Sequence, residues 1–204
     1  MNLNYSAMVR QRVESMPAGS VFFIQDFADI AGEDSVRQAL CRLARQGTIR
    51  RLMNGVFDKP AADPRIGTFP PAQADQVAAA LARHRQWDIA PYGRTALDRL
   101  GLTRVPSHVS TYVSTGPYKR YSCCGLTLEF RHRDACDISP FSPITVTVMQ
   151  ALEALGPQRV DRETVAQLRR RLPSGQLAAL RADAADIPGW MGRVMDQICV
   201  NEAS

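Results

Sequence analysis

The sequence predicts an α+β protein: an N-terminal winged helix-turn-helix, then a mixed α/β domain with an antiparallel sheet and a helical C-terminal part. Three patterns lead to this prediction. An Asn-Gly pair joins two short strand-forming runs within the first 60 residues, apolar and polar residues alternate between 108 and 133, and apolar residues recur at three- and four-residue steps from 141 onward. The predicted domains are residues 1–60, a Pro-rich linker at 61–73, and residues 74–204.

The N-terminal domain begins with the pattern of two helices separated by a strand. Apolar residues at helical spacing run through residues 1–16, and the run SVFF that follows is typical of a short strand. The stretch IQDFADIAG predicts a second helix, which Gly32 would end. Either Asp34 or Ser35 suits the N-cap of a third helix, because their side chains accept hydrogen bonds from free backbone N–H groups.

The third predicted helix, residues 35–46, has one apolar and one polar face. Its apolar stripe consists of Val36, Ala39, Leu40, Leu43 and Ala44. The opposite positions are Gln38, Arg42 and Arg45, with Ser35 and Arg37 on the flanks. These side chains can all form hydrogen bonds to bases or phosphates.

A hairpin is predicted directly after this helix. Residues 48–53 and 56–58 are rich in strand formers, and Asn54-Gly55 between them is a strong signal for a tight turn. The first of these strands carries Arg50 and Arg51, and no carboxylate lies between Arg37 and Arg51. In a winged helix the third helix enters the major groove and the hairpin lies over the neighbouring backbone, so a single charge sign on both indicates double-stranded DNA as the partner. A solvated helix face, or a winged helix used only for protein contacts, is the alternative.

The overall charge agrees with an anionic partner without requiring one. The net charge is +5, and residues 141–204 hold seven basic and seven acidic side chains, so an anion-binding surface is expected in the first two thirds of the chain. The five cysteines are an odd number without C-x-x-C spacing, and the three histidines stand far apart. We therefore expect reduced thiols in a cytoplasmic protein, with no metal site and no cofactor. No targeting signal and no membrane-spanning run is expected either.

The second domain is predicted to combine short helices at 74–85 and 95–100 with an antiparallel meander of strands between 108 and 133. It carries a basic group that could form one face of the sheet and hold DNA or RNA: Arg94, Lys119, Arg120, Arg131 and Arg133. An ordinary solvated sheet face is the alternative. Neither a nucleophile–base–acid set nor a glycine-rich phosphate loop is present, so we expect no enzyme activity. The C-terminal part should be helical and neutral, closing over the sheet or contacting a partner.

Two segments of the sequence resemble the AbiEi-type antitoxins of type IV toxin–antitoxin systems. The first is GSVFFIQDFADIAGEDSVRQALCRLARQGTIRRLMNGVFDKP, with the motifs V-x-x-A-L-x-R-L, G-x-I-x-R-L and G-V-F-x-x-P. The second is IAPYGRTALDRLGLTRVPSHVSTYVSTGPYKRYSCCGLTLEFRH, where Gly93, Ala96, the L-G-L at 100–102 and Thr115-Gly116 match the segment that follows the winged helix. Together the two cover about residues 19–133. The hairpin of that family often contains Arg-Gly-Val-Tyr, whereas this chain has Asn54-Gly-Val-Phe, which removes one arginine.

The resemblance implies an antitoxin that represses its own operon and opposes a nucleotidyltransferase-like toxin without a stable complex. It implies that the winged helix represses transcription and that the second domain is needed for neutralisation. The operator is expected to contain inverted repeats in the protein's own promoter, bound by a monomer or weak dimer. Two rivals stay open: a stand-alone winged-helix regulator without a toxin, and a protein that binds RNA or acts on nucleotides through its second domain.

Overall fold

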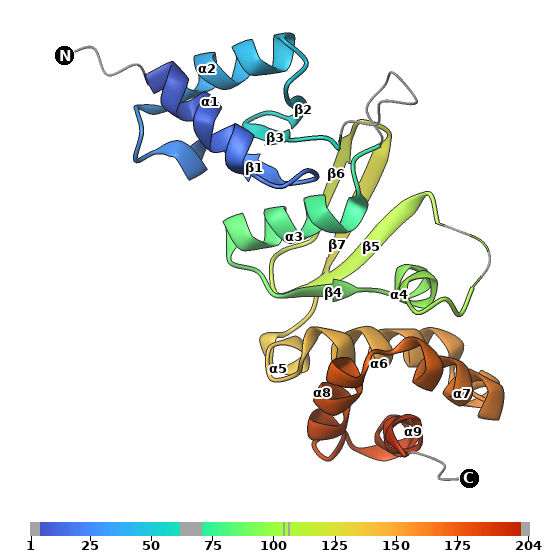
Figure 1. Ribbon diagram of the computed structural model, residues 1–204. Helices are drawn as coiled ribbons and strands as arrows, with labels where there is room; N and C mark the ends of the chain where they lie inside the picture. Colours follow the sequence, from blue (N-terminus) through green and yellow to red (C-terminus); the bar gives the residue numbers. More distant parts are fainter. Residues whose placement is uncertain (1–4, 62–70, 104, 106, 201–204) are drawn as a thin grey trace. The chain divides into compact units, whose positions relative to one another are not determined.

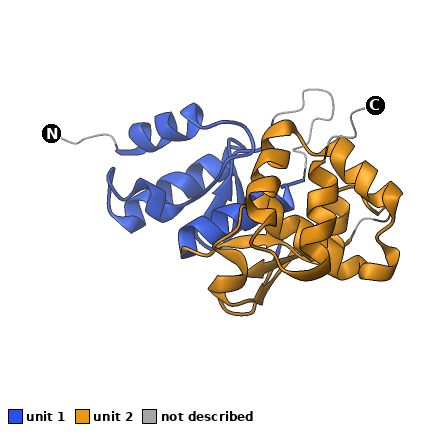
Figure 2. Cartoon of the chain, turned by 90° about the horizontal axis from the view of Figure 1, so that it is seen from below, with its two compact units in different colours: residues 1–85, 122–126 blue, residues 86–121, 127–204 orange. Residues whose placement is uncertain are grey.

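The computed structural model describes residues 5–61, 71–103, 105 and 107–200, and it confirms a mixed α+β fold with a helical C-terminal part (Figure 1). The chain forms two compact units. Unit 1 contains residues 1–85 and 122–126, and unit 2 contains residues 86–121 and 127–204 (Figure 2). Each unit is therefore assembled from more than one segment of the sequence.

Unit 1 is a helical unit with a small sheet. Its elements are α1 (Tyr5–Ser15), β1 (Val21–Phe23), the 3-10 helix η1 (Ile24–Phe27), α2 (Glu33–Arg45), β2 (Arg50–Met53), β3 (Val56–Asp58) and α3 (Ala74–Arg85). The three strands are antiparallel in the order β1-β3-β2, with Phe22 opposite Phe57. This is the element order that the sequence predicts for residues 1–60.

The core of unit 1 lies between α1, α2 and the three-stranded sheet. Phe22, Phe27 and Phe57 are almost completely buried, and the ring of Phe22 contacts both of the others. The end of α1 is held by Lys59, whose Nζ donates to the carbonyl oxygens of Glu14 at 2.6 Å and Met16 at 2.7 Å. These carbonyls lack partners inside the helix, so the lysine satisfies acceptors that would otherwise need water.

The predicted second helix is shorter than expected. It is a single 3-10 turn, η1, and the bonds that follow it are also short-range: the N–H of Ala28 donates to the Gln25 carbonyl and that of Ile30 to the Phe27 carbonyl. The carboxylate of Asp26 accepts the backbone N–H of Phe23 at 2.8 Å, which tightens the start of the turn. The third helix then begins at Glu33 with Gly32 as its N-cap, so neither Asp34 nor Ser35 caps it.

The helix α3 belongs to unit 1, although the sequence placed it in the second domain. Its apolar face, including Val77 and Leu81, is buried, and the ring of His84 stacks on Phe23 with centroids 4.0 Å apart. Arg83 Nη2 also donates to the Val21 carbonyl at 3.3 Å. The proline-rich linker expected before this helix lies largely outside the described residues.

Unit 2 joins a sheet to a helical layer. Its elements are β4 (Ile89–Pro91), α4 (Arg94–Arg99), β5 (Val109–Ser114), β6 (Lys119–Cys123), β7 (Leu126–His132), α5 (Ala135–Ile138), α6 (Pro143–Leu155), the 3-10 helix η2 (Pro157–Arg159), α7 (Arg162–Arg171), α8 (Ser174–Ala184) and α9 (Gly189–Cys199). The last residues of β6, the turn and the first residue of β7 are the segment 122–126 that groups with unit 1.

The sheet is not the antiparallel meander that the sequence predicted. Its strand order is β4-β5-β7-β6, and although β4 and β5 are antiparallel, β5 pairs with β7 in parallel, with Tyr112 opposite Phe130. The burial of the strands explains the order. Leu128 and Phe130 of β7 are completely buried, whereas Lys119 and Arg120 of β6 are exposed. The more apolar strand therefore occupies the inner position, and the charged strand forms an edge.

The helices from α6 to α9 enclose the larger core of unit 2, which includes Leu152, Leu168, Leu180, Met195 and Ile198. The hydroxyl of Ser142 caps α6 by accepting the backbone N–H of Thr145. The carboxylate of Asp183, on α8, accepts the backbone N–H of Ser142 itself at 2.8 Å. Two N–H groups at this helix start are therefore satisfied by side chains, and Pro143 at the first helical position has no N–H to satisfy.

Candidate nucleic-acid interface

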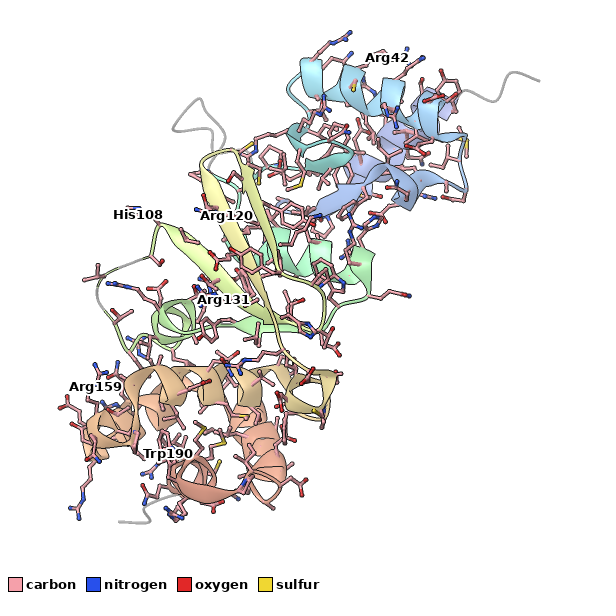
Figure 3. All side chains as sticks on the ribbon, turned by 180° about the vertical axis from the view of Figure 1, so that it is seen from behind. Arg42, His108, Arg120, Arg131, Arg159 and Trp190 are labelled. Carbon is pink, nitrogen blue, oxygen red and sulfur yellow. The ribbon has the colours of Figure 1, made fainter. Side chains whose placement is uncertain are left out.

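The outward face of α2 carries polar side chains on a firmly packed helix. Val36 and Leu40 on the inner face are completely buried, and they fix the rotation of α2 about its own axis. As a result Gln38, Arg42 and Arg45 are exposed on the opposite face, as the helical period predicts (Figure 3 labels Arg42). In the described part of the chain no side chain pairs with Gln38 or Arg45.

The flank of α2 is less positive than its sequence indicates. Arg37 Nη2 lies 2.5 Å from Glu33 Oε1, and its Nη1 lies 3.4 Å from Asp34 Oδ1. Both acids lie in the first turn of the helix, and spacings of three and four residues bring side chains together on a helix surface. Ser35, which lies between Asp34 and Arg37 in the sequence, is half-buried. Arg37 is therefore partly neutralised where it stands.

On the hairpin, Arg50 is engaged inside the protein. Its guanidinium forms a bidentate pair with Asp58, with Nη2–Oδ2 at 2.5 Å and Nε–Oδ1 at 3.1 Å. The hydrogen bonds that Arg50 donates to Asp58 raise the pKa of Arg50, and partial burial opposes this effect. The Asp58 residue is 3% exposed, so this is an internal pair between β2 and β3. The sequence predicted Arg50 as a DNA contact, whereas the structure pairs its guanidinium with Asp58.

Arg51 and Asn54 occupy the exposed side of the same hairpin. Arg51 Nη2 donates to Asn54 Oδ1 at 3.0 Å, and both residues are exposed. The turn forms at Asn54-Gly55, as predicted, and Gly55 takes a φ of 76°, which a side chain would disfavour. The strand register shifts between Arg51 and Met53. Ordinary alternation along β2 leaves Leu52 buried and Arg51 exposed. The register shift instead brings Arg50, rather than Arg51, opposite Asp58.

Two hollows lie along this surface, one on α2 alone and one that reaches from α2 to the hairpin. One, of about 380 Å³, is lined by Arg37, Gln38, Cys41, Arg42 and Arg45. The other, of about 470 Å³, is lined by Cys41, Ala44, Arg45, Gly47, Ile49, Arg50 and Arg51. Arg45 lines both hollows. The exposed cationic surface therefore continues from α2 onto β2, and Arg45 stands at its centre.

A contribution from α1 was not expected from the sequence. The Nη2 atom of Arg42 donates to the hydroxyl of Ser6 at 2.7 Å, and Nη2 of Arg10 donates to Gln46 Oε1 at 2.6 Å. Ser6 and Arg10 are four residues apart and share one face of α1. That spacing was the available signal, but only the packing of α1 against α2 shows which helix the face meets.

The model for a family of unknown function, DUF6088, matches residues 8–177. The chain belongs to the DUF6088 family. No curated protein sequence matches it. The matched range contains α2, the β2–β3 hairpin, the whole four-stranded sheet and the helices through α7, so DUF6088 membership covers both units.

The second basic group of this DUF6088 chain comes from α4, β6, β7 and the residue that follows β7. Lys119 and Arg120 are exposed on the edge strand β6. Arg131 on β7 pairs with Glu129 at 2.9 Å and its guanidinium carbon lies 5.2 Å from the centre of the Tyr92 ring. The hydrogen bond to Glu129 raises the pKa of Arg131. Figure 3 labels Arg120 and Arg131 on their two strands.

The other two members of that group have partners on different elements. Arg94 Nε donates to the Val105 carbonyl at 3.2 Å, and Arg133 Nη2 lies 3.4 Å from Glu153 on α6. Alternation along a strand had suggested that Arg131 and Arg133 act together, but β7 ends at His132 and each arginine pairs with its own glutamate. In the predicted basic group of the DUF6088 chain, Arg131 and Arg133 therefore form separate ion pairs and Arg94 donates to a backbone carbonyl, while Lys119 and Arg120 are exposed.

Across the described residues, no group of three or more His, Cys, Asp or Glu side chains is placed to hold a metal ion. Cys123 is buried and Cys124 is exposed. Burial raises the pKa of the Cys123 thiol, which disfavours the reactive thiolate. No described helix is both long and apolar enough to span a membrane.

Proposed function

We propose that unit 1 is a winged helix that binds double-stranded DNA, with α2 in the major groove and the β2–β3 hairpin over the adjacent backbone. The observation that carries the proposal is the exposed face of α2, where Gln38 and Arg45 have no partner within the described chain. Arg45 also lines the same hollow as Arg51 of the hairpin. Unpaired Gln and Arg on a rigid helix are the donors that read adenine and guanine edges. An ordinary solvated helix face usually mixes positive and negative side chains, whereas this face carries no negative one.

The structure-based roles within this proposal are divided between base and backbone contacts. Gln38 and Arg45 contact base edges, because they project from the middle of the exposed face. Arg51 and Asn54 contact the phosphate backbone from the hairpin. Arg37 contributes less than its charge indicates, since Glu33 and Asp34 lie beside it. Arg50 supports DNA binding only indirectly, by stabilising the hairpin, because its guanidinium is paired with Asp58.

We further propose that the protein is a transcriptional repressor and the antitoxin of a type IV toxin–antitoxin system. This part rests on the resemblance of residues 19–133 to AbiEi-type antitoxins. On this proposal the operator lies in the protein's own promoter, and a neighbouring nucleotidyltransferase-like toxin is opposed without a stable complex. The site of action is the cytoplasm, where both the DNA and such a toxin would be found.

The DNA proposal is tested by binding of the full-length protein to the DNA directly upstream of its gene and to a scrambled duplex of equal composition. We expect tighter binding to the upstream DNA, with a log–log salt slope of about −4 to −5 for about five phosphate contacts. Arg45→Ala should reduce discrimination by roughly 1–3 kcal/mol while it retains binding to the scrambled duplex. Arg193→Ala, an exposed arginine on α9, is the control. Equal binding of both duplexes by the wild-type protein contradicts the proposal.

The antitoxin proposal has a separate test. The chain is co-expressed with any nucleotidyltransferase gene that neighbours its own, and growth is measured. Rescue of growth by the wild-type chain and by Arg45→Ala would separate neutralisation from DNA binding. Absence of rescue would leave the alternative of a regulator without a toxin.

A further inference from the structure

We infer that Ser6, Arg10 and Arg42 form a subsite for a single backbone phosphate, so that α1 fixes the position of α2 on the DNA. The inference rests on the proposed DNA binding and deepens it. It assigns Arg42 a different role from the one that its place on the polar face of α2 predicts. It also adds two residues of α1 that no sequence pattern had connected with DNA.

The first step is the packing of α1 on α2. Val9 and Val13 of α1 are completely buried in the same core as Leu40 of α2. With this inner face fixed, Ser6 and Arg10 come to lie at the edge of α1 that faces α2. They meet residues of the C-terminal half of that helix, Arg42 and Gln46, through hydrogen bonds of 2.7 and 2.6 Å.

The second step is the shape and chemistry between the two helices. A hollow of about 270 Å³ is lined by Ser6, Ala7, Arg10, Ala39, Arg42, Leu43 and Gln46. Its floor is apolar, since Ala39 and Leu43 are buried, and its rim carries two guanidinium groups and one hydroxyl. An Arg side chain has five N–H donors and no acceptor, so two of them on one rim favour an anion. The acidic side chain nearest to Arg10 in the described structure is Glu14, at the weak distance of 4.0 Å.

The third step is the direction of Arg42. Its Nη2 already donates to Ser6, so the guanidinium group points toward α1. A bidentate contact to guanine needs two parallel N–H groups aimed straight at the base edge. A phosphate oxygen needs a single N–H and accepts a wide range of directions, which suits a guanidinium held at the side of the helix.

The position also fits the geometry of the partner. When a recognition helix lies in the major groove, its sides face the two phosphate backbones. The Ser6–Arg42 bond joins the first helix of unit 1 to the helix that we place in the groove. A phosphate bound there would set the depth and register of α2, while sequence would be read by Gln38 and Arg45.

The test measures the binding of full-length Arg10→Gln, Ser6→Ala and Arg42→Ala to the upstream and scrambled duplexes over a range of salt. Arg10→Gln should weaken both complexes equally, by about three- to tenfold at low salt, and reduce the size of the log–log slope by about 0.9. Arg42→Ala should behave in the same way, with the ratio of the two affinities unchanged. Ser6→Ala should weaken binding by a smaller factor and leave the slope unchanged. Arg193→Gln is the charge-matched control.

A second measurement locates the phosphate. Duplexes that carry one uncharged methylphosphonate linkage at a time are titrated with the wild-type protein and with Arg10→Gln. We expect one linkage at which the methylphosphonate weakens binding of the wild-type protein but does not weaken binding of Arg10→Gln any further. If the methylphosphonate weakens binding of both proteins by the same factor at every linkage, the subsite is overturned.

The outcomes separate this inference from the proposed function. If the wild-type protein binds neither duplex at low salt, DNA binding fails and the subsite fails with it. If the wild-type protein binds and Arg10→Gln matches it in affinity and slope, only the subsite is overturned. If Arg42→Ala abolishes the preference for the upstream DNA, Arg42 reads bases and the assigned role is wrong.

Discussion

Arg50 and Asp58 face each other across the paired strands β2 and β3, with their closest atoms 2.5 Å apart. The pair joins a partly exposed guanidinium to a carboxylate that is 4% exposed. A buried carboxylate without its partner is costly, because the protein interior solvates charge poorly. The pair therefore stabilises the base of the hairpin that presents Arg51.

From this relationship we expect Arg50→Ala to destabilise the protein by roughly 3 kcal/mol, since it leaves Asp58 buried and unpaired. Chemical denaturation followed by circular dichroism measures the change. Arg51→Ala, on the exposed side of the same strand, should change stability by less than about 0.5 kcal/mol. The double variant Arg50→Met/Asp58→Leu should recover much of the loss. Equal stability of Arg50→Ala and Arg51→Ala would contradict the structural role.

The acidic first turn of α2 leads to a prediction about DNA affinity. Removing both charges in Glu33→Gln/Asp34→Asn should increase affinity for either duplex by about three- to tenfold at low salt, because Arg37 is released and repulsion from phosphate is lost. Arg37→Ala should change DNA affinity little in the wild-type background, but it should clearly lower the DNA affinity of that double variant. Glu163→Gln/Asp186→Asn, on α7 and after α8, changes the charge equally and should leave affinity unaltered. The readout is fluorescence anisotropy at several salt concentrations.

The contact between α8 and the start of α6 predicts a dependence of stability on pH. Burial pushes the pKa of Asp183 upward, but hydrogen bonds from Thr145 and Ser142 outweigh it, and the net pKa is lowered. A carboxyl group with a lowered folded-state pKa stabilises the protein above its unfolded value, near pH 4, and this contribution is lost as pH falls through the folded-state pKa.

Accordingly Asp183→Ala should cost about 2 kcal/mol at pH 7, from lost hydrogen bonds to a charged group. The cost should shrink below about pH 4, where wild-type Asp183 becomes protonated. Thermal unfolding of both proteins between pH 3 and pH 7 measures the difference. A cost that stays constant over this range would show that the charge of Asp183 plays no part.

Two glycines in the C-terminal helices provide a matched pair of substitutions. A Cβ on Gly192 would lie 2.1 Å from the Ile187 carbonyl oxygen, a backbone atom that cannot easily move. Gly192→Ala should therefore destabilise the protein by about 1–3 kcal/mol. A Cβ on Gly175 meets nothing within 4 Å, and Gly175→Ala in α8 should be neutral or stabilising by up to about 1 kcal/mol. A higher melting temperature for Gly192→Ala than for Gly175→Ala would contradict the close approach of Gly192 to the Ile187 carbonyl.

Local patterns predicted much of unit 1, because its helices and hairpin have strong local signals. The apolar stripe of α2 and the Asn54-Gly55 turn both have the predicted geometry. The pairing of Arg50 with Asp58 was not predicted, because a regular two-residue turn at Asn54-Gly55 would place Arg51 opposite Asp58. Only the register shift between Arg51 and Met53 brings Arg50 to that position. The bridge from Arg37 to Glu33, by contrast, was visible as a four-residue spacing.

Other features depend on tertiary packing and had no local signal. The sequence order of the strands suggested a meander, but the burial of Phe130 against Tyr112 draws β7 between β5 and β6. The stack of His84 on Phe23 joins residues 61 positions apart, which no period in the sequence predicts. The Ser6–Arg42 bond depends in the same way on how two helices are packed. The DNA-binding role itself stays a prediction.

The segment 122–126 belongs to unit 1 although the strands on either side continue into unit 2. The chain therefore enters unit 1 twice, and a gene fragment that stops at Arg85 encodes an incomplete unit. Recombination that exchanges DNA-binding modules by joining whole segments end to end would break this arrangement. The two units are thus expected to be inherited together, and attempts to graft the first one onto another protein should begin from a design that supplies the missing turn.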